Sequence, residues 1–598
     1  MFRKLVFTVT KKDCDQPQQH LKDGSELVHP APEDISFSHD LSALDGVLLS
    51  PQESGSDDFG NDTPMLLSPI TSIESYNQTI SKALIPDESD ARRLTSINDL
   101  PLEILMKIIG YVYFDSDNFD SIYKLLESFT KLGLVSKLFH LLSVKYLYKY
   151  AAFNRPHAFH KFLINLQNNP NLGKYVQFVD FETFTSIGLG RTGKMNQEIQ
   201  MVTSRTIFTS LTKTPNLIEF LASENIQDDM NVDVLNYLFN ELPNLQSLDF
   251  CGASSKAFYE AFRGLTIDKP LKKLFKVSFH DCSNLSVDIF EKILPHLVNL
   301  RRLDLTHTSV NSSLLLNYLP NSCNLTHLSL SRCSKLTTRD LINFLVNHPS
   351  VANNQLQWLN LSVDSNVVTP LNSNYLFFTL KHMNASNLQY LNLKGLPITE
   401  KLLTLINMKF QNLKTLSIAF SSIDFEFLFE FLLSTPCLAH IDLTGCKLTK
   451  AQILQLITIP HLSSLECESQ TLKDLTNNES QFIRRDSLVW RFHDNNGRRA
   501  WIYRLESTDD QYKQIQQFGK ILNLNLTYYD LNTGEKIVTK NLRPRFLKYV
   551  GKKINCSVGF QNLQCCKHKK YLNNSYDEDV WPGKFCETGI YNYYSLNI

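Results

Sequence analysis

The sequence predicts an α/β fold in which short strands and helices alternate along a repeating array. One observation is an apolar pattern, most often Leu-x-x-Leu-x-Leu, that occurs in ten copies, one of them degenerate. Another is the spacing, since successive copies begin 24 to 32 residues apart between Leu217 and Leu462. A third is that segments with helical periodicity, such as Thr338 to Asn347, separate the copies. We therefore expect a solenoid of stacked repeats.

The copies occupy residues 245–250, 274–279, 300–305, 325–330, 356–361, 388–393, 413–418, 438–443 and 462–467, with the degenerate one at 217–220. Alternate apolar residues of each strand point to one side, and the following helix covers that side. One unit cannot bury its own apolar face, so neighbouring units must stack. The pattern resembles leucine-rich repeats, and this implies about nine or ten repeats in one curved array.

Three cysteines hold the same place in this pattern. Cys282, Cys333 and Cys446 each follow the last apolar strand residue by three positions. A small buried side chain at that place can hold the turn, so we expect reduced, packed thiols. This feature resembles the cysteine-containing repeats of F-box proteins. Cys323 and Cys437 immediately or nearly precede the next copies.

Composition divides the 598 residues into four expected regions. Residues 1–90, rich in Ser, Asp, Pro and Gln, predict a disordered acidic segment. We assign residues 94–149 to a small helical module and 151–470 to the solenoid with its atypical first repeats. Residues 482–598 predict a small mixed or mainly β domain that caps the array, with strands at 488–492, 500–503 and 521–529 and a hairpin turn near 495–497.

Charge and hydropathy exclude several classes of protein. The 60 basic and 60 acidic residues balance, which gives no support for binding to nucleic acid or to a membrane surface. No apolar run is long enough for a membrane span, and the apolar stretch near the N-terminus is too short for a signal peptide. Twelve cysteines without such a signal favour reduced thiols in the cytoplasm, the nucleus or both.

The acidic N-terminal segment contains three minimal proline-directed phosphorylation sites, at Ser50, Thr63 and Ser68. A phosphate at each would add about −1.5 to −2 charge. Residues 482–598 carry nineteen Lys or Arg against eleven acids, so we expect a weak attraction between the two ends. Ordinary Ser/Pro linker composition is the alternative explanation of these motifs.

The helical module begins where Asn98 or Asp99 can cap a helix with Pro101 and Glu103 in its first turn. Apolar residues then recur at helical spacing as far as Val112. We expect a second helix over residues 120–129 and a third over 132–148.

The order Leu-Pro-x-Glu-Ile at 100–104, followed by Leu-Val-Ser-Lys-x-Phe at 134–139, resembles an F-box. In that family the module docks on a Skp-family adaptor, which in turn binds a cullin scaffold. The resemblance implies adaptor contacts at Leu100, Pro101, Ile104, Ile108, Leu134, Val135 and Phe139. The joint between the two halves, residues 111–130, is longer than usual, which leaves the bounds of the middle helix open. A plain helical cap on the solenoid is the alternative.

The inner face of the array supplies the candidate site for a target. Trp358 and Tyr390 hold the same position on consecutive strands, so we expect their rings about 5 Å apart as an exposed aromatic platform. Trp, Tyr and Arg dominate binding hot spots. The tentative substrate-binding set is Lys276, Arg302, His327, Trp358, Tyr390 and Lys394. It suits an apolar residue beside acidic or phosphorylated ones, and a plain solvated face is the alternative.

Two motifs are better explained without a cofactor or a metal. Residues 188–195 satisfy a phosphate-loop pattern, but Met195 stands where the Mg²⁺-binding hydroxyl is needed. The tail contains Cys556, Cys565, Cys566, His568 and Cys586, whose spacing fits no standard zinc finger. We expect no catalytic residue, no metal and no cofactor.

Together these features predict a substrate receptor of an SCF-type cullin ubiquitin ligase, most like the F-box and leucine-rich-repeat proteins of fungi. Such a protein performs no catalysis itself. It brings a protein target close to a ubiquitin-charged enzyme, and the target is then degraded. One alternative is a scaffold that binds the adaptor without a cullin, and a weaker one is an enzyme that uses the cysteine-rich tail.

Overall fold

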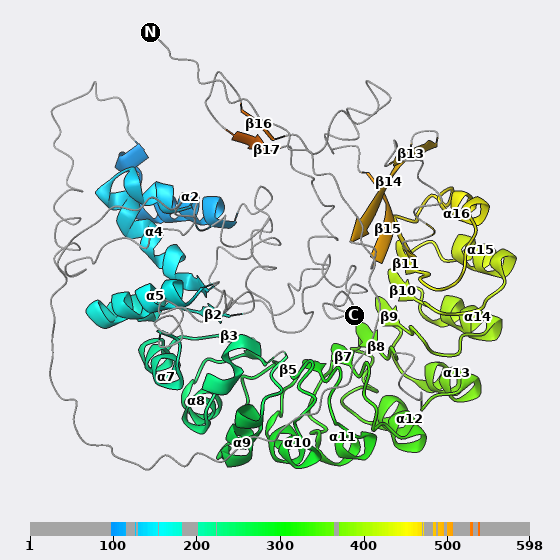
Figure 1. Ribbon diagram of the computed structural model, residues 1–598, viewed down its shortest axis with the longest axis horizontal. Helices are drawn as coiled ribbons and strands as arrows, with labels where there is room; N and C mark the ends of the chain where they lie inside the picture. The colour runs from blue at the N-terminus through cyan, green and yellow to red at the C-terminus, as the bar shows by residue number, and fades with distance from the viewer. Residues whose placement is uncertain are drawn as a thin grey trace, which may run out of the picture. The chain divides into compact units, whose positions relative to one another are not determined.

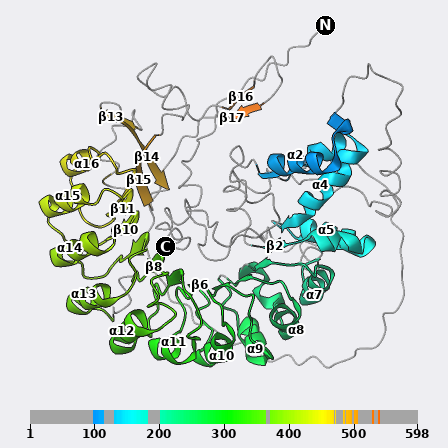
Figure 2. The same cartoon turned by 180° about the vertical axis from the view of Figure 1, so that it is seen from behind.

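The computed structural model describes residues 97–114, 126, 129–153, 155–181, 201–222, 224–250, 252–363, 370–468, 471, 482–485, 488–495, 499–505, 527–529 and 536–538. Strands β1 to β12 pair in parallel and in chain order, and β15, β14 and β13 extend the sheet beyond β12. The helices lie along the outer side of the strands in both views (Figures 1 and 2). The predicted α/β repeat array is therefore confirmed.

The parallel strands are β1 (Tyr150–Ala152), β2 (Phe178–Asp180), β3 (Glu219–Leu221), β4 (Ser247–Asp249), β5 (Lys276–Ser278), β6 (Arg302–Asp304), β7 (His327–Ser329), β8 (Trp358–Asn360), β9 (Tyr390–Asn392), β10 (Thr415–Ser417), β11 (His440–Asp442) and β12 (Ser464–Cys467). The helices of the array are α5 (Pro156–Asn168), α7 (Ser204–Lys213), α8 (Val232–Asn236), α9 (Lys256–Gly264), α10 (Val287–Ile293), α11 (Ser312–Tyr318), α12 (Thr338–Asn347), α13 (Ser373–His382), α14 (Glu400–Lys409), α15 (Phe425–Ser434) and α16 (Lys450–Leu456). Short turns of 3-10 or π helix complete it at η4 (Pro170–Tyr175), η5 (Glu224–Asp229), η6 (Tyr237–Glu241) and η7 (Leu294–His296).

Polar residues fix where several of these helices begin. The side chain of Asn311 accepts a hydrogen bond from the backbone of Leu314, and Thr399 accepts one from Leu402. Asp424 caps α15 in the same way. Such caps satisfy backbone N–H groups that the first helical turn leaves without partners. Helix α12 spans the residues expected from the sequence.

The core lies between the strands and the helices. The central residue of each strand points into it, and Leu303, Leu328 and Leu359 are fully buried. These residues are in register on adjacent strands. Burying each leucine contributes about 1.5–3 kcal/mol, and each repeat obtains this burial only from its neighbours.

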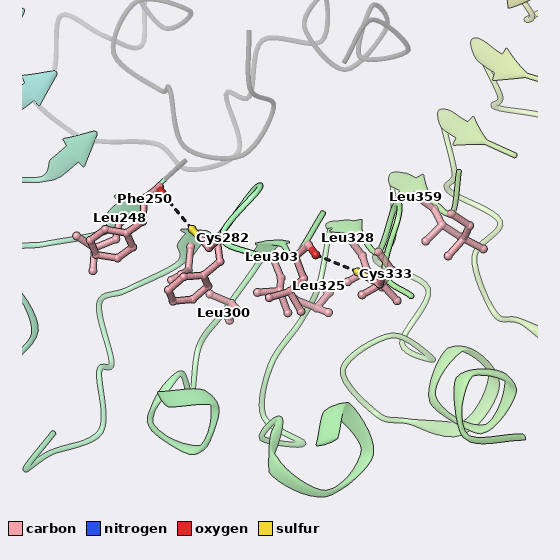
Figure 3. Close-up of a cluster of buried hydrophobic side chains, with 14 of the residues drawn as sticks. Leu248, Phe250, Cys282, Leu300, Leu303, Leu325, Leu328, Cys333 and Leu359 are labelled. Carbon is pink, nitrogen blue, oxygen red and sulfur yellow. Dashed lines mark hydrogen bonds between the residues drawn. The ribbon is translucent and has the colours of Figure 1, made fainter. Parts of the chain in front are cut away.

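The turn cysteines join consecutive repeats, as Figure 3 shows. Cys282 Sγ donates a hydrogen bond to the carbonyl of Phe250 at 3.1 Å, and Cys333 Sγ donates one to Leu305 at 3.0 Å. Burial raises the pKa of Cys333 to about 11, which keeps the thiol protonated and able to donate. For Cys282 and Cys333 the predicted buried position at the turn is confirmed, with a directed hydrogen bond in addition. Cys446 is only half-buried.

The helical module consists of α2 (Leu102–Phe114), η3 (Lys131–Leu134) and α4 (Lys137–Lys149), preceded by η1 (Ile97–Asp99). Its first helix agrees with the prediction. The continuous third helix predicted over 132–148 is wrong, because Ser136 adopts an extended conformation and its side chain accepts the backbone N–H of Phe139, so that α4 starts only at Lys137. The predicted second helix lies largely outside the described residues.

The end of the array is extended by antiparallel strands β13 (Phe482–Arg485), β14 (Leu488–Asn495) and β15 (Arg499–Arg504). The predicted hairpin is present as β14 and β15, and β15 pairs with the edge of β12. Trp490 and Ile502 are fully buried and join the solenoid core. Strands β16 (Thr527–Tyr529) and β17 (Lys536–Val538) form a separate pair. No helix within the described ranges is both long and apolar enough to cross a membrane.

Candidate binding surfaces

An exposed apolar surface forms on the helical module. Leu134 is 75% exposed and Ile104 42% exposed, and Leu100, Pro101 and Val135 are also exposed. Exposed apolar clusters of this kind mark interaction sites in soluble proteins. We call the set Leu100, Pro101, Ile104, Leu134 and Val135 the docking surface.

Local structure places these side chains at the surface. The carbonyl of Pro101 accepts hydrogen bonds from Ile104 and Leu105, so α2 starts immediately after the proline. Leu134 and Val135 lie in the turn that ends η3 and precedes the cap of α4. The hydroxyl of Tyr146 on α4 donates to the carbonyl of Met106 on α2 at 3.2 Å and ties the two helices together.

One of the predicted adaptor contacts lies elsewhere. Phe139 is only 6% exposed and packs with Leu105 and Ile109 in the core of the module. Its expected place on the docking surface is therefore wrong, because α4 turns this residue toward α2. Ile108 is half-buried. Sequence reasoning also missed Ile97 and Val112, which are exposed; Val112 continues the four-residue spacing of Leu100, Ile104 and Ile108, a signal that could have found it.

The inner face brings the predicted target-binding residues together. Lys276, Arg302, His327, Trp358 and Tyr390 pair in register on five consecutive strands. The rings of Trp358 and Tyr390 stack with centroids 4.3 Å apart and planes 2° apart. The ring of His327 stacks on the other side of Trp358 at 6.4 Å. The predicted aromatic platform is therefore confirmed as a geometric feature.

The expected exposure of this platform is wrong. Trp358 is 2% exposed and Tyr390 is fully buried, while Arg302 and His327 are also buried. For Trp358 the reason is the parallel register, which stacks its ring between those of His327 and Tyr390 and so covers both of its faces. Lys276 is half-buried, with its ammonium 3.9 Å from the buried carboxylate of Glu219.

Burial also controls protonation on this face. Burial, together with the positive charges of Arg302 and Lys276, lowers the pKa of His327 well below its ordinary value. A neutral imidazole stacks on Trp358 without the cost of a buried charge. Asp304 lies 3.0 Å from His280 Nδ1; burial alone would raise its pKa, but His280 and Thr306 hold it below its usual value.

Lys394 lies beyond the end of its strand, two residues after Asn392. It follows β9, and its ammonium lies over the ring of Phe420, 5.5 Å from the ring centroid.

Within the described ranges, no group of three or more His, Cys, Asp or Glu side chains could hold a metal ion. The tail cysteines, the glycine-rich motif at 188–195 and the three phosphorylation motifs lie outside the described residues.

The fold is that of an α/β repeat solenoid preceded by a small helical module. No protein-family model matches the chain. The chain is 31% identical over 547 residues to the F-box protein YLR352W of Saccharomyces cerevisiae, and the match covers 77% of this chain and 66% of that protein. The chain belongs to the fungal F-box proteins.

Solved structures give only weak similarities. The crystal structure of the Rad7 and Elc1 complex in yeast matches at a TM-score of 0.34 and 14% identity, over 66% of this chain and 92% of that chain. The crystal structure of the TLR13–ssRNA13 complex matches at a TM-score of 0.23 and 16% identity, over 42% of this chain and 35% of that chain. Similarity of this degree says nothing about function.

Proposed function

We propose that this protein is the substrate-recognition subunit of an SCF-type ubiquitin ligase. The observation that carries the proposal is the exposed apolar docking surface on α2 and on the turn before α4. An F-box protein needs such a surface for a Skp-family adaptor, and water is a poor partner for Leu134 and Val135. The adaptor links the chain to a cullin, and the solenoid binds the protein that is to be ubiquitinated and degraded.

In this role the chain supplies proximity and performs no chemistry. A rigid array suits that task, because each repeat packs only against its neighbours and holds its binding side chains at fixed spacing. We place the protein in the cytoplasm or the nucleus, in keeping with its cysteine content.

Changing Leu134 and Val135 to Ser together tests the docking surface. Both side chains are already exposed, so the double variant should fold normally, yet we expect adaptor affinity to fall by about 2 kcal/mol or more if both are hot spots. The matched control is Met408→Ser with Leu433→Ser, a second exposed apolar pair on α14 and α15. Co-purification of the adaptor with each full-length variant is the measurement.

Undiminished adaptor recovery with the first variant would contradict the proposal. The same co-purification addresses the alternative, because adaptor without cullin would indicate a scaffold that acts outside ubiquitination. Recovery of both adaptor and cullin with the unchanged chain is the result expected of a ligase receptor.

A further inference from the structure

The turns that follow the parallel strands form a column along one edge of the solenoid. The residue three positions after a strand has a positive φ at Gly252, Asp281, His307, Arg332, Gly395, Phe420 and Gly445. We call this set the turn column. The backbone N–H of Gly395 donates to Ala419 and that of Phe420 to Thr444, at 3.0 and 2.7 Å. The repeats therefore remain joined beyond the strands, and each turn holds a fixed place.

Phe420 differs from the other residues of the turn column in being a large apolar residue. Its φ is 64°, a left-handed conformation that glycine adopts freely and that is unfavourable for a bulky side chain. It is also 59% exposed, although it is a large apolar residue. A large apolar side chain at this place is therefore unfavourable for the backbone conformation and for the exposed ring. Strain of this kind tends to occur where a binding function requires it.

The neighbouring turns hold the Phe420 ring in place. A Cβ at Gly445 would collide with Cδ1 and Cε1 of the ring, so the ring lies directly over the glycine backbone. The ammonium of Lys394 lies over the ring at 5.5 Å from the centroid, a cation–π distance. The ring is therefore pre-positioned, which reduces the entropy lost when a partner binds.

The charges around Phe420 differ from those in the earlier turns. There, Asp281 pairs with His307 and lies 3.9 Å from Arg332. In the three turns around the ring, residues 393–397, 418–422 and 443–447, the only charged residues are Lys394 and Lys447. Lys447 is exposed. These turns therefore present positive charge beside an apolar ring.

The carboxylate that ends β11 does not offset this charge. Asp442 is buried and accepts hydrogen bonds from Ser417 and Thr444. An incoming carboxylate would therefore meet two lysines whose own turns contain no acid.

We propose that Phe420, Lys394 and Lys447 form a docking point for an acidic peptide segment of the target protein. An apolar side chain of that segment packs on the Phe420 ring, and an adjacent carboxylate pairs with the lysines. This inference rests on the proposed receptor function. It moves the aromatic contact from the buried pair Trp358 and Tyr390 to an exposed turn at the edge of the solenoid.

The test uses the purified full-length chain in complex with the adaptor and an array of nine-residue peptides. Each peptide has a central Phe or Leu, flanked on both sides by Glu, by Gln or by Lys. We expect binding in the order Glu, Gln, Lys. Phe420→Ala should weaken binding of the Glu peptides about fivefold or more. Lys394→Met with Lys447→Met should weaken it and flatten its dependence on salt.

Two further variants separate binding from folding. Phe420→Gly relieves the left-handed strain, so it should keep or raise the thermal midpoint while it loses peptide binding. Phe378→Ala removes another exposed aromatic ring, on α13, and should bind peptides as the unchanged chain does.

The inference is overturned if the unchanged chain does not prefer Glu to Lys peptides, or if Phe420→Gly binds as well as the unchanged chain. Adaptor recovery, measured on the same samples, separates this failure from that of the proposed function. All Phe420 variants should retain the adaptor, because the residue lies far along the chain from α2 and α4. Failure of the unchanged chain to bind the adaptor would instead contradict the receptor role.

Discussion

At the scale of single residues, the inner face behaves as a core. His440 is buried, with Nδ1 2.7 Å from Ser464 Oγ, and burial followed by the charge of Lys414 lowers its pKa from 6.5 to about 4. The unfolded chain therefore takes up a proton near pH 6.5, whereas the folded chain resists protonation until about pH 4. The stability that His440 contributes is present above pH 6.5 and is lost as the pH falls toward 4.

We therefore expect the thermal midpoint to fall between pH 7 and pH 5, and the fall to be smaller in His440→Gln. One such group changes the free energy of unfolding by about 1.4 kcal/mol for each pH unit inside this window. His382→Gln, at an exposed position, is the control for the substitution and should leave the thermal midpoint at pH 7 unaltered. Parallel curves for His440→Gln and the unchanged chain would show that this imidazole is not held neutral.

Cysteines permit a second comparison of buried and exposed positions. Cys333→Ala removes a buried thiol that donates to Leu305, and we expect a loss of about 1–2 kcal/mol in the free energy of unfolding. Cys437→Ala changes an exposed residue and should have almost no effect. Urea denaturation of the two variants measures the difference. Equal urea midpoints would contradict the idea that the buried turn cysteines hold consecutive repeats together.

Residue-level features were only partly predictable. The repeat register placed Trp358 beside Tyr390 because position along a strand fixes position on the neighbouring strand. It could not give their exposure, which depends on how completely neighbouring side chains cover each ring. Phe420 was missed because it lies outside the apolar pattern. Comparison of the residue three positions after every strand could have found it, since glycine occupies that place on both sides of Phe420.

At the scale of elements, strong periodicity made the strands and helices predictable, and weak periodicity did not. β1 escaped prediction because Tyr150–Ala152 lacks the leucine pattern and is defined only by pairing with β2. The break before α4 was not predicted, because a serine such as Ser136 can either continue a helix or cap a new one. The tertiary structure decides between these two conformations.

The β14–β15 hairpin offers a test at this scale. Trp490 is fully buried, and its replacement by Ala should cost about 3–5 kcal/mol and loosen the hairpin. We expect faster amide exchange at β12, because β15 then no longer protects its edge. Leu433→Ala on the outer side of α15 is the control. Unchanged exchange at β12 would mean that the edge is protected without the hairpin.

At the scale of the whole molecule, the helical module lies at one end of the described chain, and the repeat array continues from it. Tyr150 and Phe178, on β1 and β2, pack in the same core as Leu105 and Phe129 of the module. The module therefore sits on the first repeats through shared apolar contacts rather than through a free linker. This continuity suits the proposed receptor role, in which the target is held at a set distance from the ligase.

The most direct test of the receptor role is an amide-exchange footprint of the full-length chain with and without the purified Skp-family adaptor. We predict protection confined to residues 97–114 and 131–140, where the docking surface lies, and none over residues 370–468. Leu134→Ser with Val135→Ser should abolish that protection. Protection of the repeats alone, or the absence of any footprint, would contradict the claim that this chain docks on a ligase through its helical module.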